Sequence, residues 1–95
     1  MSRYISLIRF TEQGARALKK STSRAAAFRK AAAKAGVKVE AQYWTVGAYD
    51  GVLILSADTE EQALRSLTTL AAAGNVRTET MQAVGADKFS AIAAG

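Results

Sequence analysis

A tyrosine and an aspartate stand next to each other, as Tyr49 and Asp50, in the glycine-flanked segment Val46–Gly51. A positioned carboxylate can remove a proton from a substrate, while a phenol donates one to the enolate-like oxygen that forms. In a dry cavity this pair would suffice for cofactor-free proton transfer on a small hydrophobic substrate. The alternative is a structural role in the turn, because the side chain of an aspartate in a glycine-rich turn commonly forms a hydrogen bond to the backbone. We favour the second interpretation.

A second group of charged residues lies near the end of the chain. Arg77 and Glu79 are two positions apart in a strand-like run, so their side chains share one face with Met81. Arg9 joins them if that face is the one that the helices leave open. Charges inside an apolar barrel are costly to bury unless they pair or hold a polar ligand. We expect a structural Arg77–Glu79 or cross-strand ion pair, with a ligand site as the alternative.

Aromatic residues flank the same turn, with Tyr43 and Trp44 shortly before it. Aromatic packing at a subunit interface is the first interpretation, and contact with a ligand is the second. The candidate catalytic residues are therefore Asp50, Glu79 and Tyr49. The candidate ligand-binding residues are Arg9, Tyr43, Trp44, Tyr49, Arg77 and Glu79.

The residue types that are missing restrict the chemistry further. The chain has 95 residues, without cysteine or histidine. Disulfides, thiolate nucleophiles, cysteine-ligated clusters and imidazole catalysis are thereby excluded. Phosphate-loop and dinucleotide fingerprints are also absent, since no glycine run opens a helix after a strand. We expect neither a metal nor a cofactor.

Charge is divided unevenly along the chain. Residues 1–38 hold ten Lys or Arg against one acid, a balance of +9, whereas residues 39–95 hold three against seven, a balance of −4. Nucleic-acid binding is one interpretation, through Lys19, Lys20, Arg24, Arg29, Lys30 and Lys34. We favour a solvated helix face, because no aromatic stacking platform is interleaved with these cations. No apolar run is long enough to span a bilayer, so we expect a soluble, cytoplasmic protein.

Two elements of the first half must position these residues. The run at 4–10 is apolar at both parities, which predicts a strand covered on both faces. A helix is expected over 24–35, capped from the Ser/Thr run at 21–23 and ended by Gly36. The next strand, at 37–46, alternates so that all its odd positions, Tyr43 among them, share one face.

The second half repeats the pattern. Residues 52–55 are continuously apolar, as in a central strand. Asp58 or Thr59 is expected to cap a helix, with Glu61 or Gln62 at capping-box spacing. A strand follows at 76–84, and a short amphipathic tail helix ends the chain.

This order, strand, helix, strand, strand, helix, strand, predicts one α+β domain over 1–95 with the ferredoxin-like βαββαβ arrangement. Its four-stranded antiparallel sheet would carry two helices on one face. The open face would expose apolar side chains of the central strands, a patch that marks an association surface. We therefore expect a homodimer with a barrel-like core between two sheets, and further assembly stays open.

Three segments resemble the GYD domain family. Gly47–Val52 is similar to its Gly-x-Tyr-Asp signature, Gly74–Thr80 to its last strand, and Tyr4–Leu7 with Thr11–Gly14 to its opening. The resemblance implies a ferredoxin-like fold of the dimeric α/β-barrel type and implies little about activity.

Two functions remain open at this point. The first is a small-molecule binding or regulatory module that encloses an apolar or anionic metabolite near Arg9, Arg77 and Glu79. The alternative is a cofactor-independent enzyme, of monooxygenase, isomerase or dehydratase type, with Asp50 or Glu79 as the base.

Overall fold

The computed structural model describes residues 1–95 and contains four strands, four α-helices and one 3₁₀ turn. In chain order these are β1 Ser2–Phe10, α1 Glu12–Arg16, η1 Leu18–Lys20, α2 Ser21–Lys34, β2 Val37–Trp44, β3 Gly51–Ala57, α3 Glu60–Ala72, β4 Val76–Ala83 and α4 Ala86–Ala94.

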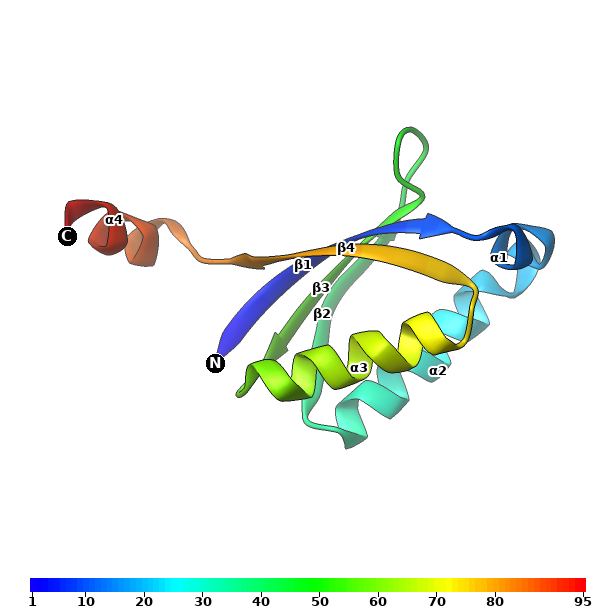
Figure 1. The fold of residues 1–95 in the computed structure, drawn as a ribbon, viewed down its shortest axis with the longest axis horizontal. Helices are drawn as coiled ribbons and strands as arrows, with labels where there is room; N and C mark the ends of the chain where they lie inside the picture. Colours follow the sequence, from blue (N-terminus) through cyan, green and yellow to red (C-terminus); the bar gives the residue numbers. More distant parts are fainter.

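The strands form one antiparallel sheet in the order β2-β3-β1-β4, and α2 and α3 both lie against one face of it (Figure 1). This is the predicted ferredoxin-like α+β fold. The two central strands are β1 and β3, the strands that are apolar at both parities. The other face of the sheet carries no helix.

Strand register decides which side chains face the helices. Ser6 lies opposite Leu53 on β3 and Thr80 on β4, and its hydroxyl is 2.7 Å from that of Thr80. On the central strands β1 and β3 most side chains of this parity are buried, because the helices cover them, whereas Thr80 on the edge strand β4 is exposed. The core on this face comprises Tyr4, Ile8, Ala32, Val37, Leu53, Leu55, Ala57, Ala63, Leu67 and Val76.

Strand β2 departs from the predicted alternation. Its pairing with β3 shifts between Val39 and Ala41, which leaves Glu40 as the extra residue of a bulge. After the bulge the parity is reversed, so Tyr43 lies on the open face and Trp44 on the helix face. The expectation that Tyr43 shares a face with Val37 and Val39 is therefore wrong.

The helix termini are partly as predicted. Thr59 caps α3 in a capping box with Gln62, and Gly36, with φ of 84°, follows α2. Helix α2, however, begins directly after η1, and Lys20 occupies its cap position without a side-chain bond. The expected Ser/Thr cap at 21–23 is wrong, because η1 already supplies a helical approach to Ser21. Helix α1 was also not predicted.

Helix α4 stands apart from the rest of the molecule. Strand β4 runs beyond the other strands, and α4 continues from its end, away from α2 and α3 (Figure 1). Phe89 and Ile92 are 60% and 57% exposed, and no residue of α4 is buried. None of the helices combines the length and the apolar character that crossing a membrane requires.

Candidate functional site

Asp50 ties the β2–β3 hairpin to the end of β1. Its amide donates to the carbonyl of Ile8 at 2.7 Å, and its carboxylate Oδ2 accepts the amide of Phe10 at 2.8 Å. Its own carbonyl accepts the amide of Thr45 at 2.9 Å. Asp50 thus makes three backbone-directed bonds and joins three strands, which supports the turn interpretation of this residue.

Tyr49 points to the opposite side of the sheet. Its hydroxyl donates to Glu79 Oε2 at 2.9 Å, and the guanidinium of Arg9 lies 4.6 Å from the centre of its ring. Arg9 also donates from Nε to the carbonyl of Ala48 at 3.1 Å. Register places Arg9 and Glu79 on the open face, where Tyr49 joins them, although the sequence grouped Tyr49 with Asp50.

The hydrogen bond to Glu79 raises the pKa of Tyr49 above its usual value, with desolvation as a smaller cause. The carboxylate accepts the phenol proton and therefore stabilises the protonated tyrosine. The positive charge of Arg9 acts in the opposite direction and is the smaller effect. Tyr49 is thus a poor proton donor to any substrate while Glu79 holds it.

Arg77 does not form the expected ion pair. The chain has three ion pairs, Arg3–Glu40, Arg16–Glu12 and Arg65–Glu61, and Arg77 belongs to none of them. Its Nη1 donates only to the carbonyl of Val76 at 3.3 Å. Glu79 binds Tyr49 instead, because the hairpin brings the phenol to it. Arg77 and Arg9 are directly opposed across β1 and β4, with no carboxylate paired to either.

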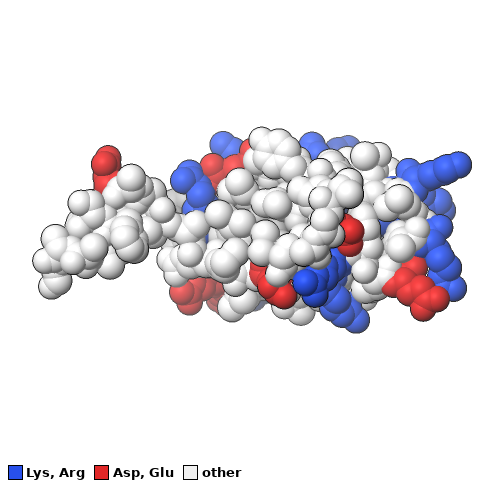
Figure 2. Space-filling view, turned by 90° about the horizontal axis from the view of Figure 1, so that it is seen from above, with Lys and Arg blue, Asp and Glu red and all other residues white.

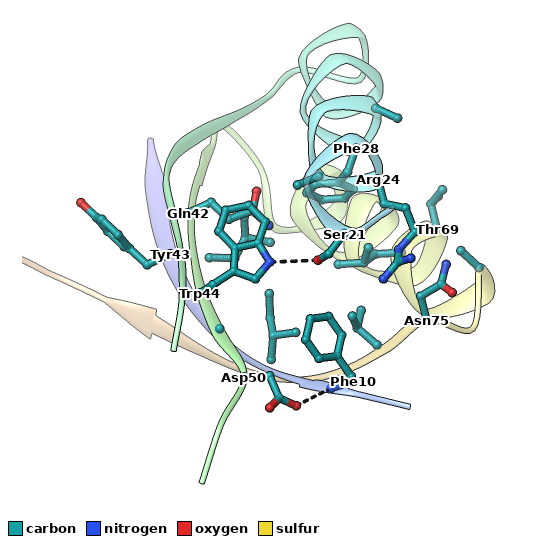
Figure 3. A pocket seen from close by; sticks show the side chains of 18 of the residues that line it. Phe10, Ser21, Arg24, Phe28, Gln42, Tyr43, Trp44, Asp50, Thr69 and Asn75 are labelled. Atoms are coloured by element: carbon teal, nitrogen blue, oxygen red, sulfur yellow. Dashed lines mark hydrogen bonds between the residues drawn. The ribbon is translucent and has the colours of Figure 1, made fainter. Parts of the chain in front are cut away.

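A cavity lies on the helix side of the sheet, not on the face of Arg9 and Glu79. It has a volume of about 340 Å³ and is bounded by α2, α3 and the sheet (Figure 3). Its walls are mostly apolar. The side chains that shape it include Ile8, Phe10, Ala27, Phe28, Ala31, Leu53, Leu70 and Val76, and the polar ones are Ser21, Arg24, Gln42, Asp50, Thr69 and Asn75.

Only part of the predicted set reaches this cavity. Trp44, Asp50 and Tyr43 border it, but the side chain of Tyr43 points away from it (Figure 3). Arg24 was named only among the cations of the nucleic-acid interpretation, and Gln42 was not predicted as a site residue. The available signal was the number of alanines in α2, because those that do not pack on the sheet, such as Ala27 and Ala31, are too short to fill the space beside the helix.

The geometry separates the two members of the proposed acid–base pair. Asp50 borders the cavity, while Tyr49 lies on the open face with Glu79. A single substrate cannot contact both side chains in this arrangement. No group of three or more acidic residues is placed to hold a metal ion.

Comparison with known sequences agrees with the fold and the hairpin. The GYD domain pattern matches residues 4–93. The chain belongs to the GYD domain family. A relative in Thermus thermophilus, named glutamine synthetase and cystathionine beta-lyase binding protein, is 33% identical over 85 residues, which are 88% of this chain and 90% of the relative.

Solved structures extend the comparison. An FFRP crystal structure superposes with a TM-score of 0.64 at 19% identity, over 88% of this chain and 100% of that one, and therefore supports the fold alone. The crystal structure of TTHA0845 from Thermus thermophilus gives a TM-score of 0.56 at 27% identity, over 90% and 96% of the two chains. This GYD domain thus has relatives of nearly its own length.

The clamp by Asp50 predicts a specific loss of stability. Asp50→Ala leaves the amide of Phe10 without its acceptor and should reduce the free energy of unfolding by about 1–3 kcal/mol. Asp50→Asn keeps an acceptor oxygen and should cost less. Urea unfolding followed by circular dichroism measures both, with Asp87→Ala on exposed α4 as the control. Equal stability of all three variants would contradict the clamp.

The open-face cluster predicts opposite pKa changes. Glu79→Gln should lower the pKa of Tyr49, and Arg9→Gln should raise it further, as followed by ¹³C NMR of ring-labelled tyrosine. The Tyr49–Glu79 bond stabilises the fold fully below the ordinary tyrosine pKa and is lost as pH rises through the raised pKa. A Tyr49 pKa that Glu79→Gln leaves unchanged would show that the bond is absent in solution.

Proposed function

We propose that this GYD domain is a homodimeric binding module whose two copies pack through the open face of the sheet. The observation that carries the proposal is that this face is apolar at its centre and uncovered within the chain. Ile5, Leu7, Val52 and Ile54 lie there on the two central strands and are only half-buried. An apolar face of this kind is typical of an association surface.

The charges on this face lie around the apolar centre. Arg3 binds both carboxylate oxygens of Glu40, at 3.1 and 3.2 Å, across β3 at one end. The Arg9, Tyr49 and Glu79 cluster lies at the other end. Figure 2, seen from the side opposite the helices, shows a broad uncharged surface with Lys, Arg, Asp and Glu mainly near its margins. A polar rim around an apolar centre is the usual anatomy of a protein interface.

Helix α4 supports the same assembly. Its apolar residues Phe89 and Ile92 have nothing to cover them in a single chain. In a face-to-face dimer with two-fold symmetry, each α4 would extend beyond its own sheet toward the other copy. We propose that it packs there and adds to the interface.

The enzyme alternative has less support. The carboxylate of Asp50 already accepts the Phe10 amide, and Glu79 already accepts the Tyr49 hydroxyl. Both candidate bases therefore have structural partners, and Tyr49 and Asp50 face different sides of the sheet. We propose that the Tyr49–Asp50 segment is structural and that binding, not proton transfer, is the function.

Partner proteins are the first class of ligand that we propose for the dimer. The relative in Thermus thermophilus is named for binding glutamine synthetase and cystathionine beta-lyase, and its alignment covers most of both chains. Arg9 and Arg77 support a contact with acidic side chains, because two neighbouring guanidiniums without carboxylate partners favour an added anion. They also offer a site for the anionic metabolite considered from the sequence.

The dimer predicts a mass of twice the 10.0 kDa of the chain. Ile54→Lys should shift the protein to monomer, because the symmetric interface would bury the charge twice. Leu64→Lys, on the exposed side of α3, is the matched control and should leave the dimer intact. Sedimentation equilibrium at micromolar concentration measures all three proteins. A wild-type protein that sediments as a monomer would overturn the dimer.

The partner proposal predicts saturable binding to purified glutamine synthetase or cystathionine beta-lyase from the organism that encodes this chain. Arg77→Gln should weaken that binding at least about tenfold if Arg77 receives a carboxylate, since charge-assisted bonds contribute about 1.5–3 kcal/mol. Arg29→Gln, an exposed cation on α2, is the control and should bind like wild type. Surface plasmon resonance at about 0.15 M salt, the physiological ionic strength, is the measurement. Absence of binding to both enzymes would remove these partners.

A further inference from the structure

We propose that the cavity between α2, α3 and the sheet binds a small apolar carboxylic acid, with its carboxylate held by Arg24. This site lies on the helix side of the sheet and is separate from the proposed dimer face. It would give the module a metabolite ligand in addition to its protein partners.

The cavity exists because α2 is rich in alanine. Ala25 and Ala32 are buried and let the helix approach the sheet closely. Ala27 and Ala31 are exposed, line the cavity and are too short to fill it. The resulting volume of about 340 Å³ is within the range of roughly 300–1,000 Å³ typical of small-molecule sites. Its walls come mainly from aliphatic side chains and phenylalanine, which suit an apolar ligand body.

Arg24 is the only cation in the lining, and it has no carboxylate partner. Its Nη1 donates to the carbonyl of Ala17 at 2.8 Å and its Nη2 to that of Gly14 at 3.4 Å. A guanidinium has five N–H groups, so several remain for a ligand. The Ala17 and Gly14 carbonyls hold this half-buried side chain at the cavity wall before any ligand arrives.

The segment that holds Arg24 is itself fixed. A Cβ on Gly14 would lie only 2.0 Å from the carbonyl oxygen of Asn75, so only glycine permits this close packing of α1 against the start of β4. Thr11 strengthens the contact, because its hydroxyl donates to the carbonyl of Gly74 at 2.6 Å. Arg24 is therefore preorganised, and a bound carboxylate would not have to order it.

Among the charged and polar residues of the lining, Arg24 is the one that can bind the carboxylate of a ligand. Asp50 is the only acid there, and its Oδ2 is occupied by the Phe10 amide (Figure 3). Gln42 is different, because its Oε1 is buried and its side-chain amide makes no hydrogen bond. A hydroxyl or amino group on the ligand would satisfy that buried acceptor.

Trp44 supplies a reporter at the same site. It is the single tryptophan of the chain, it lines the cavity, and its Nε1 donates to Ser21 Oγ at 2.9 Å, which joins β2 to α2. A ligand that enters the cavity changes the surroundings of the indole ring. Tryptophan fluorescence therefore reports occupancy without a label.

The test titrates the full chain with octanoate and with 4-phenylbutyrate, each below its aggregation concentration, and with 1-octanol as the uncharged counterpart. At least one of the two acids should change Trp44 fluorescence saturably and bind at least about tenfold more tightly than the alcohol, as charge-assisted bonds imply. Arg24→Gln should remove this preference for the acid. Arg24→Lys, which keeps the charge, should retain part of it.

A pair of α2 variants keeps the test decisive if the Arg24 variants fold poorly. Ala31→Phe fills the cavity and should abolish binding, whereas Ala33→Phe makes the same change at an exposed position outside the lining and should bind like wild type. Failure of both acids to bind, or binding that Ala31→Phe leaves unchanged, would overturn the cavity site. Sedimentation of the same samples shows the dimer separately, so each proposal can fail without the other.

Discussion

The three bonds of Asp50 are the constraint on which the rest of the structure depends. Through its amide, carboxylate and carbonyl, this residue holds the β2–β3 hairpin against the end of β1. Along the chain, the β2–β3 hairpin is the connection between the two halves of the βαββαβ fold. In space, β1 of the first half must pair with β3 of the second half at the centre of the sheet. Asp50 fixes them where pairing ends, so the sheet can close over its core.

The same constraint divides the molecule into two surfaces. The carboxylate of Asp50 is held by the amide of Phe10, whereas the hydroxyl of the preceding Tyr49 reaches Glu79 on the open face. There Tyr49 organises Arg9 and Glu79 at the margin of an apolar surface, while the opposite side of the sheet contains the cavity with Arg24. The proposed protein surface and the proposed small-molecule site therefore lie on opposite sides of the sheet in one domain of 95 residues.

Much of this could be predicted from the sequence, and the exceptions have physical reasons. Apolar residues at both parities of 4–10 and 52–55 identified the central strands, and the Thr59–Gln62 spacing identified the capping box. The bulge at Glu40 could not be seen in the alternation, and it moved Trp44 to the helix face. The Arg77–Glu79 pair was wrong because sequence spacing did not reveal that the hairpin delivers Tyr49 to Glu79. The cavity was missed because it is the space that the short side chains of Ala27 and Ala31 leave unfilled beside α2.

In the proposed dimer, two copies pack through the open face of the sheet and not through the helix face. Isotope-filtered NOE spectroscopy on a mixture of ¹³C-labelled and unlabelled protein tests this directly, because it detects only contacts between copies. A dimer through the open face predicts intermolecular contacts from the methyl groups of Ile5, Leu7, Val52 and Ile54. It predicts none from Leu53 or Leu55, which are fully buried beneath the helices. Intermolecular contacts at other surfaces alone, with none from these four residues, would contradict it.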